Sequence, residues 1–244
     1  MGIIEHDRRL GVLAFGDSIT NGGGELQWGL ALQSWALWVA RGLGLPYSGY
    51  AADGARAGDV VADQIPAHAH RGPGPEARYE LGCLYIGAND VRGFDWEPAD
   101  YARNLATALR YLAERCDAVL AVTLPLDLGR PRAGAKVSEC NAIIERTAED
   151  AGALILDLSN FAARNLLMAD RVHPTAFGQI AIAERALDVL GPAGLPAVVR
   201  PSSLISYQTT RLGRLRGDLT YARRYAWVLL EARWETWRAG RSAA

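Results

Sequence analysis

The chain reads Leu13-Ala14-Phe15-Gly16-Asp17-Ser18-Ile19-Thr20 near its amino end, an apolar run that turns polar at Gly16. A short apolar run of this kind predicts a buried strand, and the Gly-Asp-Ser that follows predicts a turn at the carboxyl end of that strand. Open α/β sheets bind and process their ligands at this edge. The sequence therefore predicts that the Ser18 hydroxyl lies where such a sheet carries out its chemistry.

Strands and helices are expected to alternate outward from this run. Apolar runs predict strands at 11–15, 46–52, 80–86, 118–123 and 153–158. Helical spacing predicts helices at 26–43, 56–65, 98–115, 138–151 and 174–190, with Pro66 ending the second and a Gly/Pro loop following at 69–75. Repeated strand–helix units imply a parallel sheet covered on both faces. We therefore predict an α/β protein, a three-layer α/β/α sandwich around five parallel strands.

A second polar run, Asp170-Arg171-Val172-His173-Pro174, comes near the end of the predicted core. An Asp three residues before a His can orient the imidazole and hold its tautomer, so that the other ring nitrogen accepts a serine proton. Since strand exits share one edge of a parallel sheet, Ser18, the turn at 51–54 and the run at 87–90 should lie close together. The Ser18 N–H, a backbone N–H of the second turn and the Asn89 amide can then donate hydrogen bonds to an oxyanion.

Three runs, Gly16–Thr20, Gly87–Asp90 and Asp170–His173, resemble the first, third and fifth blocks of the SGNH/GDSL hydrolases, the GDSL-type esterases and lipases of bacteria. Their order and spacing agree over roughly residues 11–190. The resemblance implies a flavodoxin-like sheet and a Ser-His-Asp hydrolase that acts on esters, thioesters or acetylated carbohydrates. Such a hydrolase needs no metal ion and no organic cofactor.

The resemblance also implies a role for individual residues. Ser18 matches the nucleophile, His173 and Asp170 match the other members of the triad, and Asn89 matches an oxyanion donor. The second block is a looser match, because Gly49 stands where the family often has Asn. Gly54 matches the glycine whose N–H donates to the oxyanion, with Ala51 as the alternate.

We expect a serine esterase that hydrolyses carboxylic esters of small acyl, lipid or acetylated carbohydrate type through an acyl-enzyme. An acyltransferase or thioesterase on the same triad is one alternative, and a non-catalytic binding module that uses the carboxyl-terminal helix is another. Asp17, Phe94 and Trp96 are the candidates for substrate contact, and Trp28 and Trp35 are further aromatic candidates. The pair His68 and His70 is expected on a solvated surface rather than at a metal ion, because no carboxylate or Cys partner is near in sequence.

The composition of the chain limits the classes of protein to which it can belong. The chain has 244 residues, half of them hydrophobic, which suffices to bury a core without disulfides or metal ions. A net charge of −1 offers no field that would capture nucleic acid. Cys83, Cys116 and Cys140 are widely spaced and form no zinc or redox pattern, and Cys83 and Cys116, in or beside apolar runs, are expected to be buried thiols. There is no signal-peptide core and no apolar run near the roughly 18 residues that span a membrane, so a cytoplasmic protein is expected.

The carboxyl-terminal part is positively charged, whereas the rest of the chain is negatively charged. Residues 1–199 carry 17 basic and 24 acidic side chains, whereas residues 200–244 carry 9 and 3. We therefore expect a catalytic domain at 1–195 and an Arg/Trp-rich helical extension at 196–244, helical over 215–238. Three interpretations stay open: a helix packed across the catalytic domain, a homodimer contact or pocket lid, or a helix lying on an anionic membrane surface.

Overall fold

The computed structural model describes residues 9–24, 30, 32–74, 76–206 and 211–242, with the side chains of the last helix described at 211–212 and 215–230. Five strands form one sheet in the order β2-β1-β3-β4-β5, and every neighbouring pair is parallel. Their bounds are β1 Val12–Gly16, β2 Tyr47–Gly49, β3 Tyr79–Tyr85, β4 Cys116–Val122 and β5 Leu154–Leu156. The five predicted strands are confirmed, β2 and β5 being shorter than expected.

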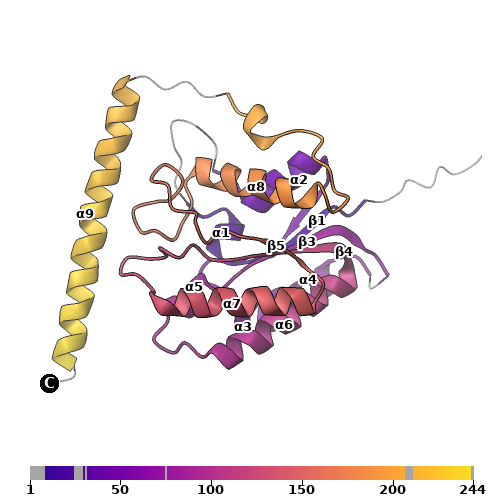
Figure 1. Ribbon diagram of the computed structural model, residues 1–244, viewed down its shortest axis with the longest axis horizontal. Coiled ribbons are helices and arrows are strands. Elements are labelled where there is room, and N and C mark those ends of the chain that lie inside the picture. Colours follow the sequence, from indigo (N-terminus) through magenta and orange to yellow (C-terminus); the bar gives the residue numbers. More distant parts are fainter. Residues whose placement is uncertain (1–8, 25–29, 31, 75, 207–210, 243–244) are drawn as a thin grey trace, which may run out of the picture.

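Helices cover both faces of the sheet (Figure 1). On one face α2 (Trp35–Leu43) packs against α8 (Ala176–Leu190), and on the other α6 (Pro98–Arg115) packs against α7 (Ala135–Asp150). The interior strand β1 is fully buried, as the continuous apolar run at 12–15 predicts for a strand with helices on both sides. The predicted three-layer α/β/α sandwich is therefore confirmed, and Cys83, Cys116 and Cys140 are buried free thiols within it.

The helix predicted at 26–43 is wrong in its first half. Residues 30 and 32–34 are not helical, residues 25–29 and 31, with Trp28, lie outside the described part, and α2 begins at Trp35. Two side chains determine this start. The Ser34 hydroxyl accepts the Ala36 N–H, and the Gln179 amide oxygen accepts the Trp35 N–H at 2.8 Å. Since the first N–H groups of a helix need such acceptors, the helix begins where they are supplied.

The predicted stop at Pro66 is also wrong. The chain runs through α3 (Ala57–Asp59) and a π-helical turn, η1 (Val60–Gln64), into α4 (Ile65–Arg71). Pro66 falls in the first turn of α4, where a missing N–H costs no hydrogen bond. Just before it, the Ile65 N–H donates to the Val60 carbonyl, which is the i to i−5 hydrogen bond of a π-helical turn.

The continued helix corrects the prediction for His68, which is 2% exposed rather than on a solvated surface. Its Nδ1 lies 2.7 Å from the Tyr111 hydroxyl and its Nε2 lies 3.2 Å from the Tyr79 hydroxyl. Phe15 and Tyr50 contact the ring edge to face. Burial lowers the pKa of His68, so the imidazole serves as a neutral, hydrogen-bonded part of the core.

The carboxyl-terminal segment has two parts. Residues 196–206, with the short helix η2 (Pro201–Leu204), pack against α2 and α8, and the N–H groups of Val198 and Val199 donate to the Gly42 carbonyl. The long helix α9 (Arg211–Ser242) lies beyond the edge where β1 and β3 lead into α1 (Ser18–Asn21) and α5 (Ala88–Arg92) (Figure 1). No helix within the described ranges has the length and hydropathy needed to cross a bilayer.

Candidate active site

The turn between β1 and α1 presents Ser18. Asp17 caps α1, since one of its carboxylate oxygens accepts the Ile19 N–H at 2.9 Å. Ser18 is the first residue of the helix and is partly exposed. Gly16 has a φ of 152°, and a Cβ added there would lie 2.5 Å from the Tyr85 carbonyl oxygen and 2.6 Å from the Thr20 hydroxyl, so a larger residue would not fit.

Two buried glutamines hold this turn in place. Gln64 accepts the Gly16 N–H at 3.0 Å and donates to the Gly16 carbonyl at 2.8 Å. Gln179 donates to the Ile19 carbonyl at 2.9 Å and to the Gly23 carbonyl at 3.1 Å. A buried amide is costly unless it is paired, so both side chains depend on the turn as much as the turn depends on them. Sequence analysis missed both, because their partners are far away in the chain.

Ser18, His173 and Asp170 form one line of hydrogen bonds. Ser18 Oγ lies 2.9 Å from His173 Nε2, and His173 Nδ1 lies 2.7 Å from Asp170 Oδ2. The other Asp170 oxygen accepts the N–H groups of Val172 and His173. The structure thus brings together three residues that the sequence singled out from opposite ends of the predicted domain.

The hydrogen bond between Asp170 and His173 shifts the pKa values of both side chains. Burial works against ionisation of Asp170, but hydrogen bonds from His173 and from the Val172 N–H outweigh it, so the pKa of Asp170 is lowered. The hydrogen bond to Asp170 raises the pKa of His173, and burial opposes this only in part. The pair therefore favours an ionised Asp170 beside an imidazole that readily accepts a proton.

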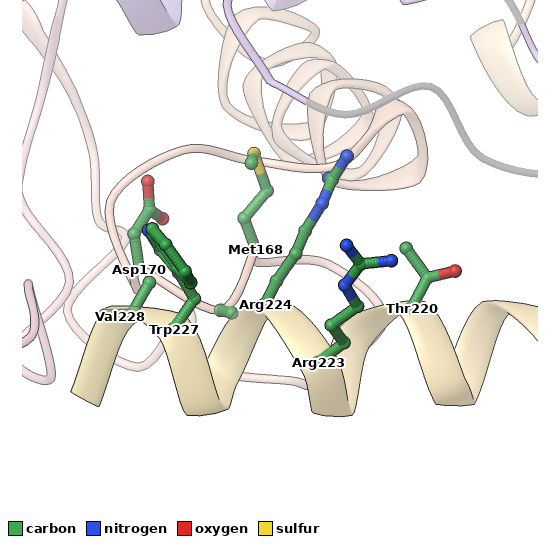
Figure 2. A pocket seen from close by; sticks show the side chains of 8 residues that line it. Met168, Asp170, Thr220, Arg223, Arg224, Trp227 and Val228 are labelled. Atoms are coloured by element: carbon green, nitrogen blue, oxygen red, sulfur yellow. The ribbon is translucent and has the colours of Figure 1, made fainter. Parts of the chain in front are cut away.

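A cleft of about 620 Å³ opens beside Asp170. Met168, Ala169 and Asp170 form one wall. The other wall belongs to α9 and consists of Thr220, Arg223, Arg224, Trp227 and Val228. Figure 2 shows these side chains on the side of α9 that faces Met168 and Asp170, with Trp227 and Val228 nearest to Asp170. The cleft therefore lies at the Asp170 end of the hydrogen-bonded line, and the extension forms half of it.

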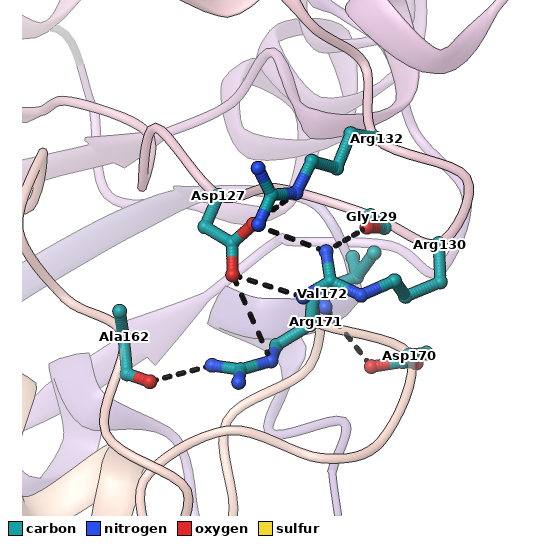
Figure 3. A network of polar contacts seen from close by, with 8 residues as sticks. All are labelled: Asp127, Gly129, Arg130, Arg132, Ala162, Asp170, Arg171 and Val172. Atoms are coloured by element: carbon teal, nitrogen blue, oxygen red, sulfur yellow. Dashed lines mark hydrogen bonds and ion pairs between the residues drawn. The ribbon is translucent and has the colours of Figure 1, made fainter. Parts of the chain in front are cut away.

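The loop that carries Asp170 and His173 is held by a polar network around Asp127 (Figure 3). Asp127 pairs with Arg130 at 2.9 Å and with Arg132 at 2.6 Å, and Arg171 Nε lies 3.9 Å from it. Arg171 also donates to the Ala162 carbonyl and accepts the Gly129 N–H through its own carbonyl.

Arg171 has a φ of 58°, a left-handed conformation that is unfavourable for a residue with a side chain. Its contacts stabilise this conformation, and the bend that results lets Asp170 reach back to His173. Asp127 and Arg171 are thus further residues of the site that sequence analysis did not single out. Only the position of Arg171 between Asp170 and His173 could have indicated it.

The second and third turns flank Ser18, because β2 and β3 lie on either side of β1. Asn21 donates to Asp53 at 2.9 Å, which ties α1 to the second turn, and Asn89 Nδ2 donates to the Ala55 carbonyl at 3.0 Å, which ties the third turn to the second. Gly54 has a φ of 76°, and a Cβ there would meet no atom within 4 Å. The alternate residue, Ala51, lines a separate hollow of about 310 Å³ beside α1.

The three candidates for substrate contact occupy different settings. Asp17 is 1% exposed, one of its oxygens has no hydrogen-bond partner among the described residues, and burial raises its pKa to about 7. Phe94 is fully exposed. Trp96 is half-buried against Tyr101 and donates to Glu139 at 2.8 Å. Trp35, a further aromatic candidate, is fully buried in the core. Within the described part of the chain, no group of three His, Cys, Asp or Glu side chains could hold a metal ion.

Residues 14–180 match a family model described as the GDSL-like Lipase/Acylhydrolase family. Two solved structures share the fold. A variant of Axe2, an acetyl xylan esterase from Geobacillus stearothermophilus, matches over 77% of this chain and 96% of its own, with 20% sequence identity and a TM-score of 0.56. LAE5, an alpha/beta hydrolase enzyme from the metagenome of Lake Arreo, Spain, matches over 74% and 94%, with 20% identity and a TM-score of 0.58. No curated protein matches the chain.

Proposed function

This chain belongs to the GDSL-like lipase/acylhydrolase family and is a serine ester hydrolase, and we propose that Ser18, His173 and Asp170 are the triad with which it cleaves carboxylic esters. One observation carries the proposal. Ser18 Oγ lies within hydrogen-bond distance of His173 Nε2, while Nδ1 of the same ring is paired with Asp170. A hydroxyl in contact with an oriented base is the arrangement that nucleophilic acyl transfer requires.

In the first step Ser18 Oγ attacks the ester carbonyl carbon, and His173 Nε2 takes the hydroxyl proton. Asp170 stabilises the imidazolium through the Nδ1–H hydrogen bond. The carbonyl oxygen becomes an oxyanion, for which the N–H groups of Ser18 and Gly54 and the Asn89 amide are the proposed donors. An amide group has two N–H bonds, so Asn89 can hold Ala55 with one and the oxyanion with the other.

In the second step the carbon–oxygen bond to the alcohol breaks, and the proton on His173 passes to the leaving oxygen. The acyl group remains on Ser18 Oγ as an ester. Water then attacks this acyl-enzyme, gives its proton to His173 and releases the carboxylic acid, and the proton returns to Ser18 Oγ.

The proposed substrates are carboxylic esters with a small acyl group, lipid esters or acetylated carbohydrates. The Geobacillus structure with the same fold is named as an acetyl xylan esterase, which is a reason to include acetylated sugars among the test substrates.

The test is a panel of p-nitrophenyl esters from acetate to decanoate, with wild type, Ser18→Ala and the exposed-serine control Ser202→Ala. We expect Ser18→Ala to lose hydrolysis and labelling by a fluorophosphonate, and Ser202→Ala to keep both. Hydrolysis by Ser18→Ala at the wild-type rate would refute the proposal. Labelling of Ser18 without hydrolysis of any ester would instead point to the transfer of an acyl group to an alcohol.

A further inference from the structure

Helix α9 is attached to the loop that carries the proposed base. Arg164, in the segment that leads to Asp170, pairs with Asp218 of α9 at 2.8 Å, and its guanidinium lies 4.7 Å from the centre of the Tyr221 ring. One arginine therefore makes two contacts with adjacent turns of α9. These contacts keep the helix beside Asp170, and the cleft between them is a feature of the folded chain.

The proton transfer from His173 to the leaving oxygen indicates which part of the substrate lies near this cleft. His173 Nε2 must reach the leaving oxygen to protonate it, so the alcohol part of the ester has to lie alongside the imidazole. The opposite edge of the same ring, Nδ1, is paired with Asp170, and Asp170 lines the cleft. An alcohol that extends along the ring from Nε2 toward Nδ1 therefore enters the cleft. The acyl part remains on the other side, near the turns after β2 and β3.

The lining of the cleft indicates which alcohols fit. Met168, Ala169, Trp227 and Val228 offer an apolar surface, and Arg223 and Arg224 add guanidinium groups. A volume of about 620 Å³ is in the range of sites for small organic ligands.

The charge around the cleft favours an anion. Its lining holds the guanidinium groups of Arg223 and Arg224 and one carboxylate, that of Asp170, which is already paired with His173. An anionic group that enters the cleft therefore meets more positive than negative charge.

We propose that this cleft is the subsite for the alcohol part of the ester, and that it selects alcohols with an apolar body and an anionic group, a carboxylate or a phosphate. The inference rests on the proposed function, because it uses His173 as the group that protonates the leaving oxygen. It assigns the carboxyl-terminal extension a part in substrate selection.

The test compares two aryl acetates of the same shape, 4-acetoxybenzoate and 4-acetoxybenzamide, which differ in the charge of the alcohol part. We expect the wild-type kcat/KM to favour the carboxylate by roughly two- to fivefold, the size of a solvent-exposed ion pair. Arg223→Gln should bring the ratio close to one. The matched control is Arg216→Gln, an exposed arginine of α9 that is not among the described residues of the cleft, and it should keep the wild-type ratio. Raised salt should weaken the preference in the wild type.

The apolar wall has its own test. Trp227→Ala should lower kcat/KM for naphthyl acetate more than for methyl acetate, because only the larger alcohol reaches the cleft. Leu230→Ala, which removes an exposed α9 side chain outside the cleft, should leave the ratio of the two substrates unchanged. An equal effect of Trp227→Ala on both esters would contradict the assignment.

Binding without turnover separates this inference from the proposed function. In the Ser18→Ala background, calorimetric titration should show tighter binding of 4-acetoxybenzoate than of 4-acetoxybenzamide, and adding Arg223→Gln should remove the difference. Equal binding of the two esters would overturn the subsite, even if hydrolysis depends on Ser18. Undiminished hydrolysis by Ser18→Ala would overturn the proposed function instead.

A phosphate-bearing alcohol is tested in the same way. Acetyl esters of glycerol and of glycerol 3-phosphate are compared in wild type, Arg223→Gln and Arg216→Gln. A preference for the phosphate ester that only Arg223→Gln removes supports the subsite. No preference for either anion would overturn it.

Discussion

Replacing Gln64 by leucine should damage both the stability and the activity of the protein. The substitution removes two hydrogen bonds to Gly16, at 3.0 Å and 2.8 Å, and leaves a buried N–H without an acceptor. A net hydrogen bond contributes about 1 kcal/mol, and a buried unsatisfied group costs about 1–3 kcal/mol, so we expect Gln64→Leu to lower the free energy of unfolding by about 2–4 kcal/mol. The kcat should fall more than KM rises, because Gly16 sets the position of Ser18 two residues later.

The measurement is urea unfolding followed by circular dichroism, together with kcat per folded molecule on p-nitrophenyl acetate. Gln33→Leu is the control, since among the described residues the Gln33 side chain accepts a hydrogen bond from Arg41 at the surface, and it should change the free energy of unfolding by less than about 0.5 kcal/mol. A Gln64→Leu protein that matches this control in stability and keeps full kcat would refute the reasoning.

The isosteric change Gln64→Glu adds a pH dependence to the same prediction. In its protonated form the introduced carboxyl can still donate to the Gly16 carbonyl, but in its ionised form it places a buried negative charge against that oxygen. Burial raises the pKa of such a carboxyl in the folded state above its value of about 4.3 in the unfolded chain. The folded protein then binds more protons than the unfolded one, so stability is highest below this unfolded pKa and falls as pH rises toward the folded pKa. Stability of Gln64→Glu that is equal to wild type at pH 7 would contradict this.

Three further predictions concern the proposed triad, its loop and the second turn. Because hydrogen bonding to Asp170 raises the pKa of His173, kcat/KM of the wild type should fall as pH drops below this raised pKa. Asp170→Asn should shift this acidic limb of the pH–rate profile to lower pH and slow the reaction by roughly 10²–10⁴-fold. Arg171→Ala should destabilise the protein by about 1–3 kcal/mol through loss of its contacts, and Arg171→Gly should cost about 1 kcal/mol less because glycine tolerates a φ of 58°; equal costs in urea unfolding would contradict the strain argument. Gly54→Ala should cost about 1 kcal/mol of stability from its φ of 76° alone, since no atom is close, and should lower kcat while leaving fluorophosphonate access to Ser18 intact.

Helix and strand positions followed from sequence wherever the deciding residues are local. The helix predicted at 98–115 coincides with α6, because Pro98 marks its first turn and Tyr101, Leu105, Leu109 and Leu112 repeat at helical spacing. The prediction at 26–43 was wrong where the acceptor that helps to start α2, Gln179, is 144 residues away. A pattern of apolar residues can continue past a helix boundary that a distant side chain determines.

In the candidate site, too, some features follow from neighbouring residues and others depend on distant ones. The sequence by itself determined the candidate residues, because the Gly-Asp-Ser turn, the Asn89 turn and the Asp170–His173 pair are each encoded within a few neighbouring residues. It also determined that these turns share one edge, since parallel strands end on the same side of a sheet.

Only the tertiary structure decided what holds and surrounds these groups. Gln64 and Gln179 look like ordinary polar helix residues until folding buries them against the turn that carries Ser18. Asp127 meets Arg171, and α9 meets Asp170, only once distant segments are packed together. The physical reason is that turn and helix preferences arise from neighbouring residues, whereas a buried hydrogen bond or a cleft wall depends on which remote groups the fold brings within a few ångströms.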